Sequence, residues 1–134
     1  MKVVLDTNVI VAAFAARGLC AELFKVCLSK YEIILSEYIL LEVGKNLTKK
    51  IKLPQAIVEE ILHFLREHSR IVEPELIETP MLKDKKDLPI IGTAIRGHAQ
   101  FLITGDKELL ALRKFESLKI LSPREFWKRL KETI

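Results

Sequence analysis

Four acidic residues that are far apart in the sequence occupy positions suited to catalysis. Asp6 directly follows an apolar, β-branched segment, and Asp106 comes two residues after another apolar segment. Glu42 lies about two turns into a predicted helix, and Asp87 stands where another helix is predicted to begin. Carboxylates that converge in space can bind a hard divalent cation or exchange protons with a substrate. Whether these four converge depends on the elements that carry them.

Each acid also has a simpler structural interpretation. Asp6 and Asp106 could cap the helices that follow them, and Asp87 could favour the N-terminus of its helix. Glu42 could be an ordinary solvated helix residue. Asp6 fits this interpretation least well, because it lies between an apolar strand and an apolar helix.

Strands and helices are predicted to alternate along the chain. The sequence pattern predicts strands at residues 2–5, 32–35, 101–104 and 118–121, with a short one near 71–72 in an otherwise irregular stretch. Helices are predicted at 7–14, 21–28, 90–96 and 107–112, and also after the N-cap Ser36, with Pro54 in the first turn of another, and from a capping box at residues 122–125. This alternation predicts an α/β fold, a mainly parallel sheet with helices on both faces, in a single domain of residues 1–134.

In an open α/β sheet, ligands bind beyond the carboxyl ends of the strands. Asp6 and Asp106 therefore share one edge of the predicted sheet, and Glu42 and Asp87 reach it if their helices pack in the usual sense. Two carboxylates ~4 Å apart repel by roughly 4 kcal/mol at an effective dielectric near 20. Several such pairs are costly for a domain that is stable by only ~5–15 kcal/mol. A bound cation resolves the conflict, and an oxygen-only ligand set selects Mg²⁺ or Mn²⁺.

Composition restricts the remaining possibilities. The net charge of +4, from 22 basic and 18 acidic residues, permits a nucleic-acid partner without demonstrating one. Cys20 and Cys27 lie seven residues apart in a predicted helix, ~10 Å from each other, which is too far for a disulfide. Without paired histidines or a C-x-x-C motif, a zinc site is not expected. No apolar run is long enough for a bilayer span and none resembles a signal peptide, so we expect a cytoplasmic protein without a membrane partner.

Four segments together resemble the PIN domain family, and in particular its VapC-like toxin ribonucleases. They are residues 4–9, Ser36 with Glu42, Asp84 with Asp87 before an apolar helix, and residues 103–110. The order, the spacing and the whole length match. The resemblance implies an α/β/α sandwich and a ribonuclease that depends on Mg²⁺ or Mn²⁺, with one or two ions per site.

The same resemblance assigns roles to individual residues. It implies that Asp6, Glu42, Asp87 and Asp106 form the catalytic, metal-binding quartet, that Asn8 and Thr104 line the site, and that Asp84 is a further acid. Lys85 and Lys86 replace the proline and the acid that relatives often have, which argues against a metal role for this loop beyond Asp87.

A mechanism can be written as a hypothesis. Asp6 and Asp106 would hold the principal ion, with Asp87 as a direct or water-mediated ligand. Glu42 would orient or deprotonate the attacking water or help to hold a second ion. Two ions ~3.5–4 Å apart could stabilise the attacking and leaving oxygens of a phosphodiester displacement.

Several basic residues are candidates for gripping RNA. Lys85 and Lys86 are favoured because they adjoin Asp87, and the others are ordinary solvated side chains unless they lie close to the acids. These others are Lys49, Lys50, Lys52, Lys83, Arg113 and Lys114. The resemblance also suggests a small antitoxin protein as partner, and a homodimer that uses part of the leucine- and isoleucine-rich helices within residues 37–68.

Two other classes of function stay open at this point. One is a catalytically degenerate PIN-like module that binds RNA or protein. The other is a Mg²⁺-dependent phosphatase or phosphoacceptor domain, which also places an aspartate after a first parallel strand. Haloacid-dehalogenase-type enzymes require a second acid two residues later, where this chain has Asn8, and a receiver domain requires acids next to its phosphoacceptor strand.

Overall fold

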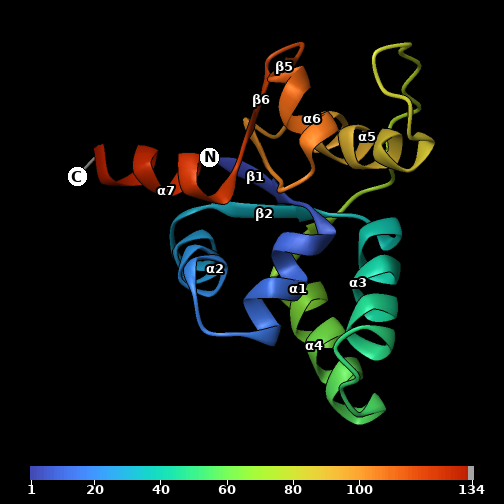
Figure 1. The fold of residues 1–134 in the computed structure, drawn as a ribbon, viewed down its shortest axis with the longest axis vertical. Helices are drawn as coiled ribbons and strands as arrows, with labels where there is room; N and C mark the ends of the chain where they lie inside the picture. Colours follow the sequence, from blue (N-terminus) through green and yellow to red (C-terminus); the bar gives the residue numbers. More distant parts are fainter. Residues whose placement is uncertain (133–134) are drawn as a thin grey trace.

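A six-stranded sheet forms the centre of the computed structural model, which describes residues 1–132 (Figure 1). The strands lie in the order β3-β2-β1-β4-β6-β5, and every neighbouring pair is parallel except the antiparallel pair β5 and β6. Their bounds are β1 Lys2–Leu5, β2 Glu32–Leu35, β3 Ser69–Ile71, β4 Phe101–Ile103, β5 Lys114–Phe115 and β6 Leu118–Leu121. The mainly parallel sheet predicted from the sequence is confirmed.

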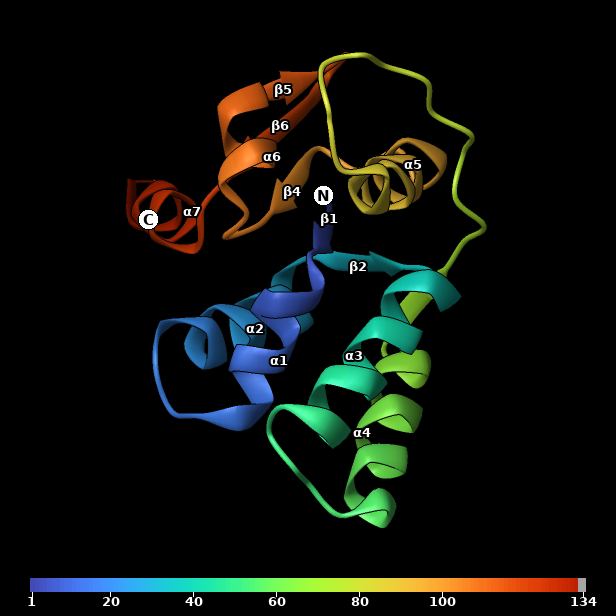
Figure 2. The same ribbon diagram turned by 45° about the vertical axis from the view of Figure 1, so that its right-hand side comes forward.

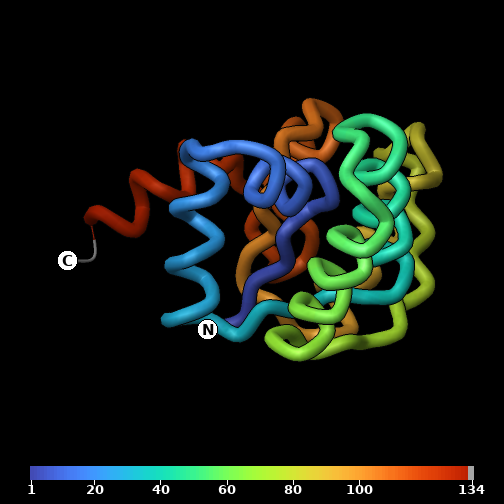
Figure 3. Tube along the Cα trace, turned by 90° about the horizontal axis from the view of Figure 1, so that it is seen from below, coloured from blue at the N-terminus to red at the C-terminus, as the bar shows by residue number. Residues whose placement is uncertain are grey.

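Helices cover both faces of this sheet. Figures 1 and 2 show α1 to α4 on one side and α5 and α6 on the other, and Figure 3 shows α7 extending away from the body. The helices are α1 Thr7–Ala15, α2 Leu19–Lys30, α3 Glu37–Lys49, α4 Gln55–Glu67, α5 Leu88–Arg96, α6 Lys107–Leu112 and α7 Pro123–Glu132, with one 3₁₀ turn, η1 Lys85–Asp87. The predicted α/β/α sandwich is confirmed. No helix within residues 1–132 is both long and apolar enough to cross a bilayer.

The central strands are continuously apolar because both of their faces are buried. Val4 pairs with Ile34 of β2 on one side and with Leu102 of β4 on the other, and all three side chains are fully buried. Asp6 and Thr104 come directly after β1 and β4. The polar residues therefore begin where the buried strands end, at the carboxyl edge of the sheet.

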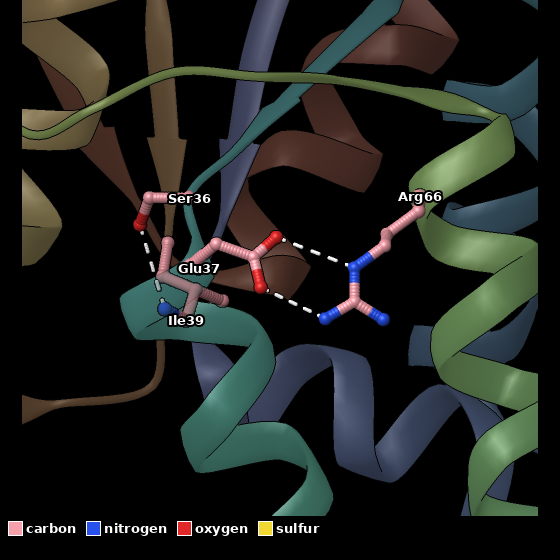
Figure 4. Close-up of polar contacts among 4 residues, drawn as sticks. All are labelled: Ser36, Glu37, Ile39 and Arg66. Atoms are coloured by element: carbon pink, nitrogen blue, oxygen red, sulfur yellow. Dashed lines mark hydrogen bonds and ion pairs between the residues drawn. The ribbon is translucent and has the colours of Figure 1, made fainter.

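Helix α3 begins with a polar cap and is fixed to α4 by an ion pair (Figure 4). The Ile39 amide donates to Ser36 Oγ at 3.4 Å, which confirms Ser36 as the N-cap. The carboxylate of Glu37 accepts two hydrogen bonds from the Arg66 guanidinium, at 2.8 and 3.3 Å. Both side chains are exposed, so the pair contributes little stability, but its forked geometry orients α4 against α3, the helix that carries Glu42.

Three local predictions differ from the structure. Strand β3 ends at Ile71 and does not centre on residues 71–72, and Pro54 precedes α4 instead of occupying its first turn. The two-residue strand β5 was not predicted, because its hairpin depends on Arg113 and Glu116 at positive φ, a conformation that the pattern of side chains does not signal. The C-terminal capping box is confirmed by reciprocal bonds between Ser122 and Glu125.

An irregular segment, residues 72–84, connects β3 to η1 and is called the strap here (Figure 2). The Glu75 amide donates to the Gly92 carbonyl of α5 at 2.9 Å, and the Glu75 carboxylate accepts from Arg96 at 2.7 Å. A Cβ atom on Gly92 would lie only 2.2 Å from the Glu75 carbonyl oxygen. Glycine is therefore required at position 92 for the strap to approach α5.

We expect Gly92→Ala to lower the free energy of unfolding by about 1–3 kcal/mol, because backbone must move to relieve the overlap. Gly44→Ala in α3 is the matched control: its added methyl meets only the flexible end of Leu62, at 3.2 Å. Since alanine favours a helix over glycine by about 1 kcal/mol, the control should be neutral or stabilising. Urea unfolding of both variants measures the difference, and equal effects would contradict the assigned role of Gly92.

Candidate active site

Two of the predicted acids, Asp6 and Asp106, are joined by Thr104 at the carboxyl edge of the sheet. The Thr104 hydroxyl donates to Asp6 Oδ2 at 2.7 Å and accepts from the Asp106 amide at 3.0 Å. Asp6 and Thr104 are buried, whereas Asp106 is half-buried. Thr104, predicted only to line the site, thus links the ends of two adjacent strands.

Asp6 and Asp106 also cap helices, as the simpler interpretation predicted. Asp6 Oδ1 accepts from the Thr7 amide at 2.7 Å, and Asp106 Oδ1 accepts from the Leu109 amide at 3.0 Å. Burial nevertheless raises the pKa of Asp6, and the charge of Asp106 raises it further, against the lowering effect of the bonds from Thr104 and Thr7. Capping therefore accounts for part of the surroundings of Asp6 and leaves an electrostatic cost.

Asp87 is not explained as a helix cap. It precedes α5, yet its carboxylate makes no capping bond, and its Oδ2 is buried without any hydrogen-bond partner. Its side chain is 8% exposed. Burial, and then the charges of neighbouring acids, raise the pKa of Asp87 to about 7, and these neighbours are Asp106, Asp84, Asp6 and Glu108. A buried carboxylate with a free oxygen and acidic neighbours has the surroundings of a cation ligand.

Glu42 lies on α3, close enough to Tyr38 for its charge to act on the Tyr38 hydroxyl. The pKa of Tyr38 is raised first by burial and then by the charges of Glu42, Asp84, Asp87 and Asp6. Glu42 is about one third exposed, and Lys45 lies 4.0 Å from its carboxylate. Tyr38 was not predicted as a site residue, although its position four residues before Glu42 places both on one helix face.

The other predicted residues surround this group. Asn8 is exposed in the first turn of α1, and Lys85 and Lys86 are exposed in η1. Asp84 is exposed as well and caps η1 through a 2.9 Å bond from the Lys86 amide. Glu108, a further acid that sequence reasoning missed, accepts a hydrogen bond from the Lys83 amide and so fixes the strap to α6. Its place in the first turn after Asp106 was the available signal.

A buried hydroxyl pair connects α3, which carries Glu42, to α5, which directly follows Asp87. Thr93 Oγ1 of α5 lies 2.8 Å from Ser36 Oγ, the cap of α3, and 2.7 Å from the Pro89 carbonyl oxygen. Both hydroxyl residues are fully buried. Ser36 therefore does more than begin a helix: it sets the position of α3 relative to the start of α5.

The donor atoms available here suit a hard cation, because they are carboxylate and hydroxyl oxygens without thiol or imidazole. No three carboxylate, histidine or cysteine side chains in the described part of the chain stand close enough together to hold one ion in this conformation. Asp6, Asp106 and Asp84 each use an oxygen for a hydrogen bond, whereas Asp87 Oδ2 is free. The group fits a cation in chemistry and charge, and its acids must turn inward to bind one together.

The raised pKa of Asp87 predicts a specific pH dependence of stability. Because the folded-state pKa of about 7 exceeds the reference value of 3.8, the folded protein binds more protons than the unfolded chain between these values. Stability from this group is therefore highest below about pH 4 and falls until about pH 7. In metal-free buffer, Asp87→Asn should raise the melting temperature relative to the parent at about pH 8 and change it little at about pH 4.

Glu60→Gln, an exposed position on α4, is the control for loss of a carboxylate. It should show the same stability difference from the parent at both pH values. If Asp87→Asn behaves in the same way as this control, the carboxylate of Asp87 is not under electrostatic stress.

Comparison with known proteins places this arrangement in a family. A family model described as the PIN domain matches residues 2–108. No curated protein matches. Among solved structures, this chain is similar to one in the crystal structure of VapBC2 from Rickettsia felis bound to a DNA fragment from their promoter. The two chains superpose with a TM-score of 0.63 and are 15% identical in sequence, and the match covers 91% of this chain and 98% of that one. That likeness shows a shared fold. The family match extends from β1 to the start of α6, and so includes all four predicted acids: the chain belongs to the PIN domain family.

Proposed function

We propose that this protein is a metal-dependent endoribonuclease that hydrolyses RNA phosphodiester bonds. Membership of the PIN domain family supports a nuclease. The observation that carries the proposal is the state of Asp87, whose buried Oδ2 has no partner among acids that raise its pKa. A structural aspartate is usually capped or paired, whereas Asp87 leaves a buried carboxylate oxygen available to a cation.

Within this proposal the acids have separate roles. Asp6, Asp87 and Asp106 would hold Mg²⁺ or Mn²⁺, as one or two ions. When bound, the metal supplies positive charge for the phosphate oxygens and acidifies water. Thr104 fixes the orientation of Asp6, in the way that outer-sphere residues fix metal ligands. Glu42 would orient the attacking water and accept its proton as the new phosphorus–oxygen bond forms, and the ribose oxygen would leave as its own bond to phosphorus breaks and take a proton from solvent.

The alternatives have less support. The phosphatase hypothesis depended on one aspartate after the first strand, and the family match favours the nuclease. A degenerate PIN module would have lost part of its acidic group, yet the charge of Asp106 raises the pKa of both Asp6 and Asp87. Turnover of RNA by the pure protein distinguishes these possibilities.

We also infer that the protein acts as the toxin of a toxin–antitoxin pair in the cytoplasm, with a small antitoxin as its partner. The support is the fold shared with a chain of VapBC2. A homodimer remains part of this proposal.

Asp6→Asn tests the proposal directly. The substitution keeps the shape of the side chain and removes the charge, so cleavage of single-stranded RNA in Mn²⁺ should fall by more than about 100-fold, beyond the loss typical of an outer-sphere partner. The melting temperature of the metal-free variant should stay equal or rise, because a buried charge is removed. Normal cleavage by this variant would refute the metal role of Asp6, and no cleavage by the parent protein with either ion would refute the nuclease.

Lys85 and Lys86 are proposed to contact RNA phosphates beside the acids. Their replacement by glutamine should weaken RNA binding and make its salt dependence less steep. The slope of log affinity against log salt concentration should change by about 0.7 for each phosphate that is no longer neutralised. Lys30→Gln with Lys128→Gln, two exposed lysines on α2 and α7, removes the same net charge elsewhere. Equal slopes for the two double variants would exclude a local grip by η1.

A further inference from the structure

A cleft of about 400 Å³ lies directly beside the acids, between α3, the strap and the start of α5. Its size is within the roughly 300–1,000 Å³ of small-ligand sites. Its walls are mainly apolar, with one aromatic ring and one cation, and they include Tyr38, Pro74, Leu76, Ile77, Lys85 and Pro89. None of the proposed metal ligands lines this cleft, so it is distinct from the acidic group.

The cleft and the acidic group share a wall. Tyr38 lines the cleft, while its hydroxyl donates to the Lys86 carbonyl at 3.1 Å and experiences the charges of Glu42 and Asp87. On the opposite side, Leu88 and Pro89 of the cleft directly follow Asp87 in the chain. A molecule whose reacting group lies at the acids can therefore reach the cleft past Tyr38.

The outer wall of the cleft is held in place although it belongs to an irregular segment. Glu75 is fixed to α5 through the Gly92 carbonyl and Arg96, at 2.9 and 2.7 Å. Leu76, the next residue, is 87% exposed. These bonds, made by the amide and the carboxylate of Glu75, fix the backbone next to Leu76, whose apolar side chain stays in water at the mouth of the cleft.

We propose that this cleft binds one unpaired nucleobase of the RNA, adjacent to the phosphodiester at the acids. This inference rests on the proposed function, because it takes the occupant from the substrate. Single-stranded nucleic acid is bound by aromatic side chains on which bases stack, together with cations for the backbone phosphates. Tyr38 supplies the ring, Pro74, Leu76 and Pro89 supply apolar surface for the flat faces of the base, and Lys85 supplies the cation.

The arrangement favours a base over a peptide as occupant. Lys85 lies at the rim, next to acids whose charges would repel an acidic peptide. The same acids would repel RNA when no metal is bound. Only an occupant whose own phosphate lies at the acids benefits from both the apolar cleft and the cation next to it. Since a base enters only when it leaves its pair, the cleft selects RNA that is single-stranded at that nucleotide.

The test uses a single-stranded oligoribonucleotide that carries 2-aminopurine, whose fluorescence is quenched when it stacks on an aromatic ring. Binding is measured to the full-length Glu42→Gln protein in Mg²⁺, which keeps Asp6, Asp87 and Asp106 as the proposed metal ligands, with the probe base moved along the oligonucleotide. We expect quenching at one position. Tyr38→Ala in this background should abolish the quenching and weaken binding by about 5- to 150-fold, the usual effect of removing one base–aromatic stack. Tyr38→Phe, which keeps the ring and lacks the bond to Lys86, should retain the quenching.

Leu76→Ala keeps the test valid if Tyr38→Ala disturbs the fold, because Leu76 is 87% exposed. It should weaken binding, whereas Met81→Ala, at a 67% exposed position of the strap outside the cleft, should not. Unchanged quenching in Tyr38→Ala, or equal affinity of the Leu76 and Met81 variants, would overturn the proposal and leave the cleft to a protein partner. Quenching in the binding test together with no RNA cleavage by the parent protein in either ion would support the base site and refute the nuclease, so the two failures can be told apart.

Discussion

The constraint on which this structure depends is the mutual repulsion of carboxylates that have been taken out of water. Burial alone raises the pKa of both Asp6 and Asp87, and each is raised further by Asp106. In a domain stable by only about 5–15 kcal/mol, such a group is a net cost unless a counter-charge is bound. The same electrostatics that weaken the metal-free protein would favour the proposed divalent ion, because a bound cation would offset both the repulsion and the cost of burying the charges.

The fold holds these charges in place by surrounding them with structure that does not depend on them. The strands β1 and β4, which end beside Asp6 and Thr104, are buried on both faces, and the Thr104 hydroxyl ties one acid to the next. The buried pair Ser36 and Thr93 connects the helices that carry Glu42 and Asp87. Repulsion would separate acids on flexible loops. Here each acid stands within one or two turns of a packed helix or strand, so the backbone resists that separation.

Much of the fold could be predicted because its signals are local. Continuous apolar runs marked the buried strands, and Ser36 and Ser122 marked helix starts that the structure confirms. What could not be predicted depends on tertiary contacts. The hairpin β5–β6 depends on two positive φ angles, and the strap is positioned by the close approach of Glu75 to Gly92, which no pattern in either segment reveals.

The candidate site divides in the same way. The acids follow strands or begin helices and were visible in the sequence, whereas Tyr38 and Glu108 became evident only once α3, α6 and the strap were packed together.

The helix-capping interpretation of the acids and the metal-binding interpretation are compatible, because a capping bond leaves further lone pairs on the carboxylate for an ion. Asp6 and Asp106 each use Oδ1 for a capping bond, which fixes the side chain and leaves the other carboxylate oxygen directed elsewhere; for Asp6, that oxygen accepts from Thr104. Asp87 stands before α5 without a capping bond, so the positive end of that helix favours its charge without occupying its oxygens. Asp87 keeps Oδ2 free and directly precedes Leu88 and Pro89, which line the apolar cleft with Tyr38 and Leu76, so the backbone at this point joins the acidic group to the cleft.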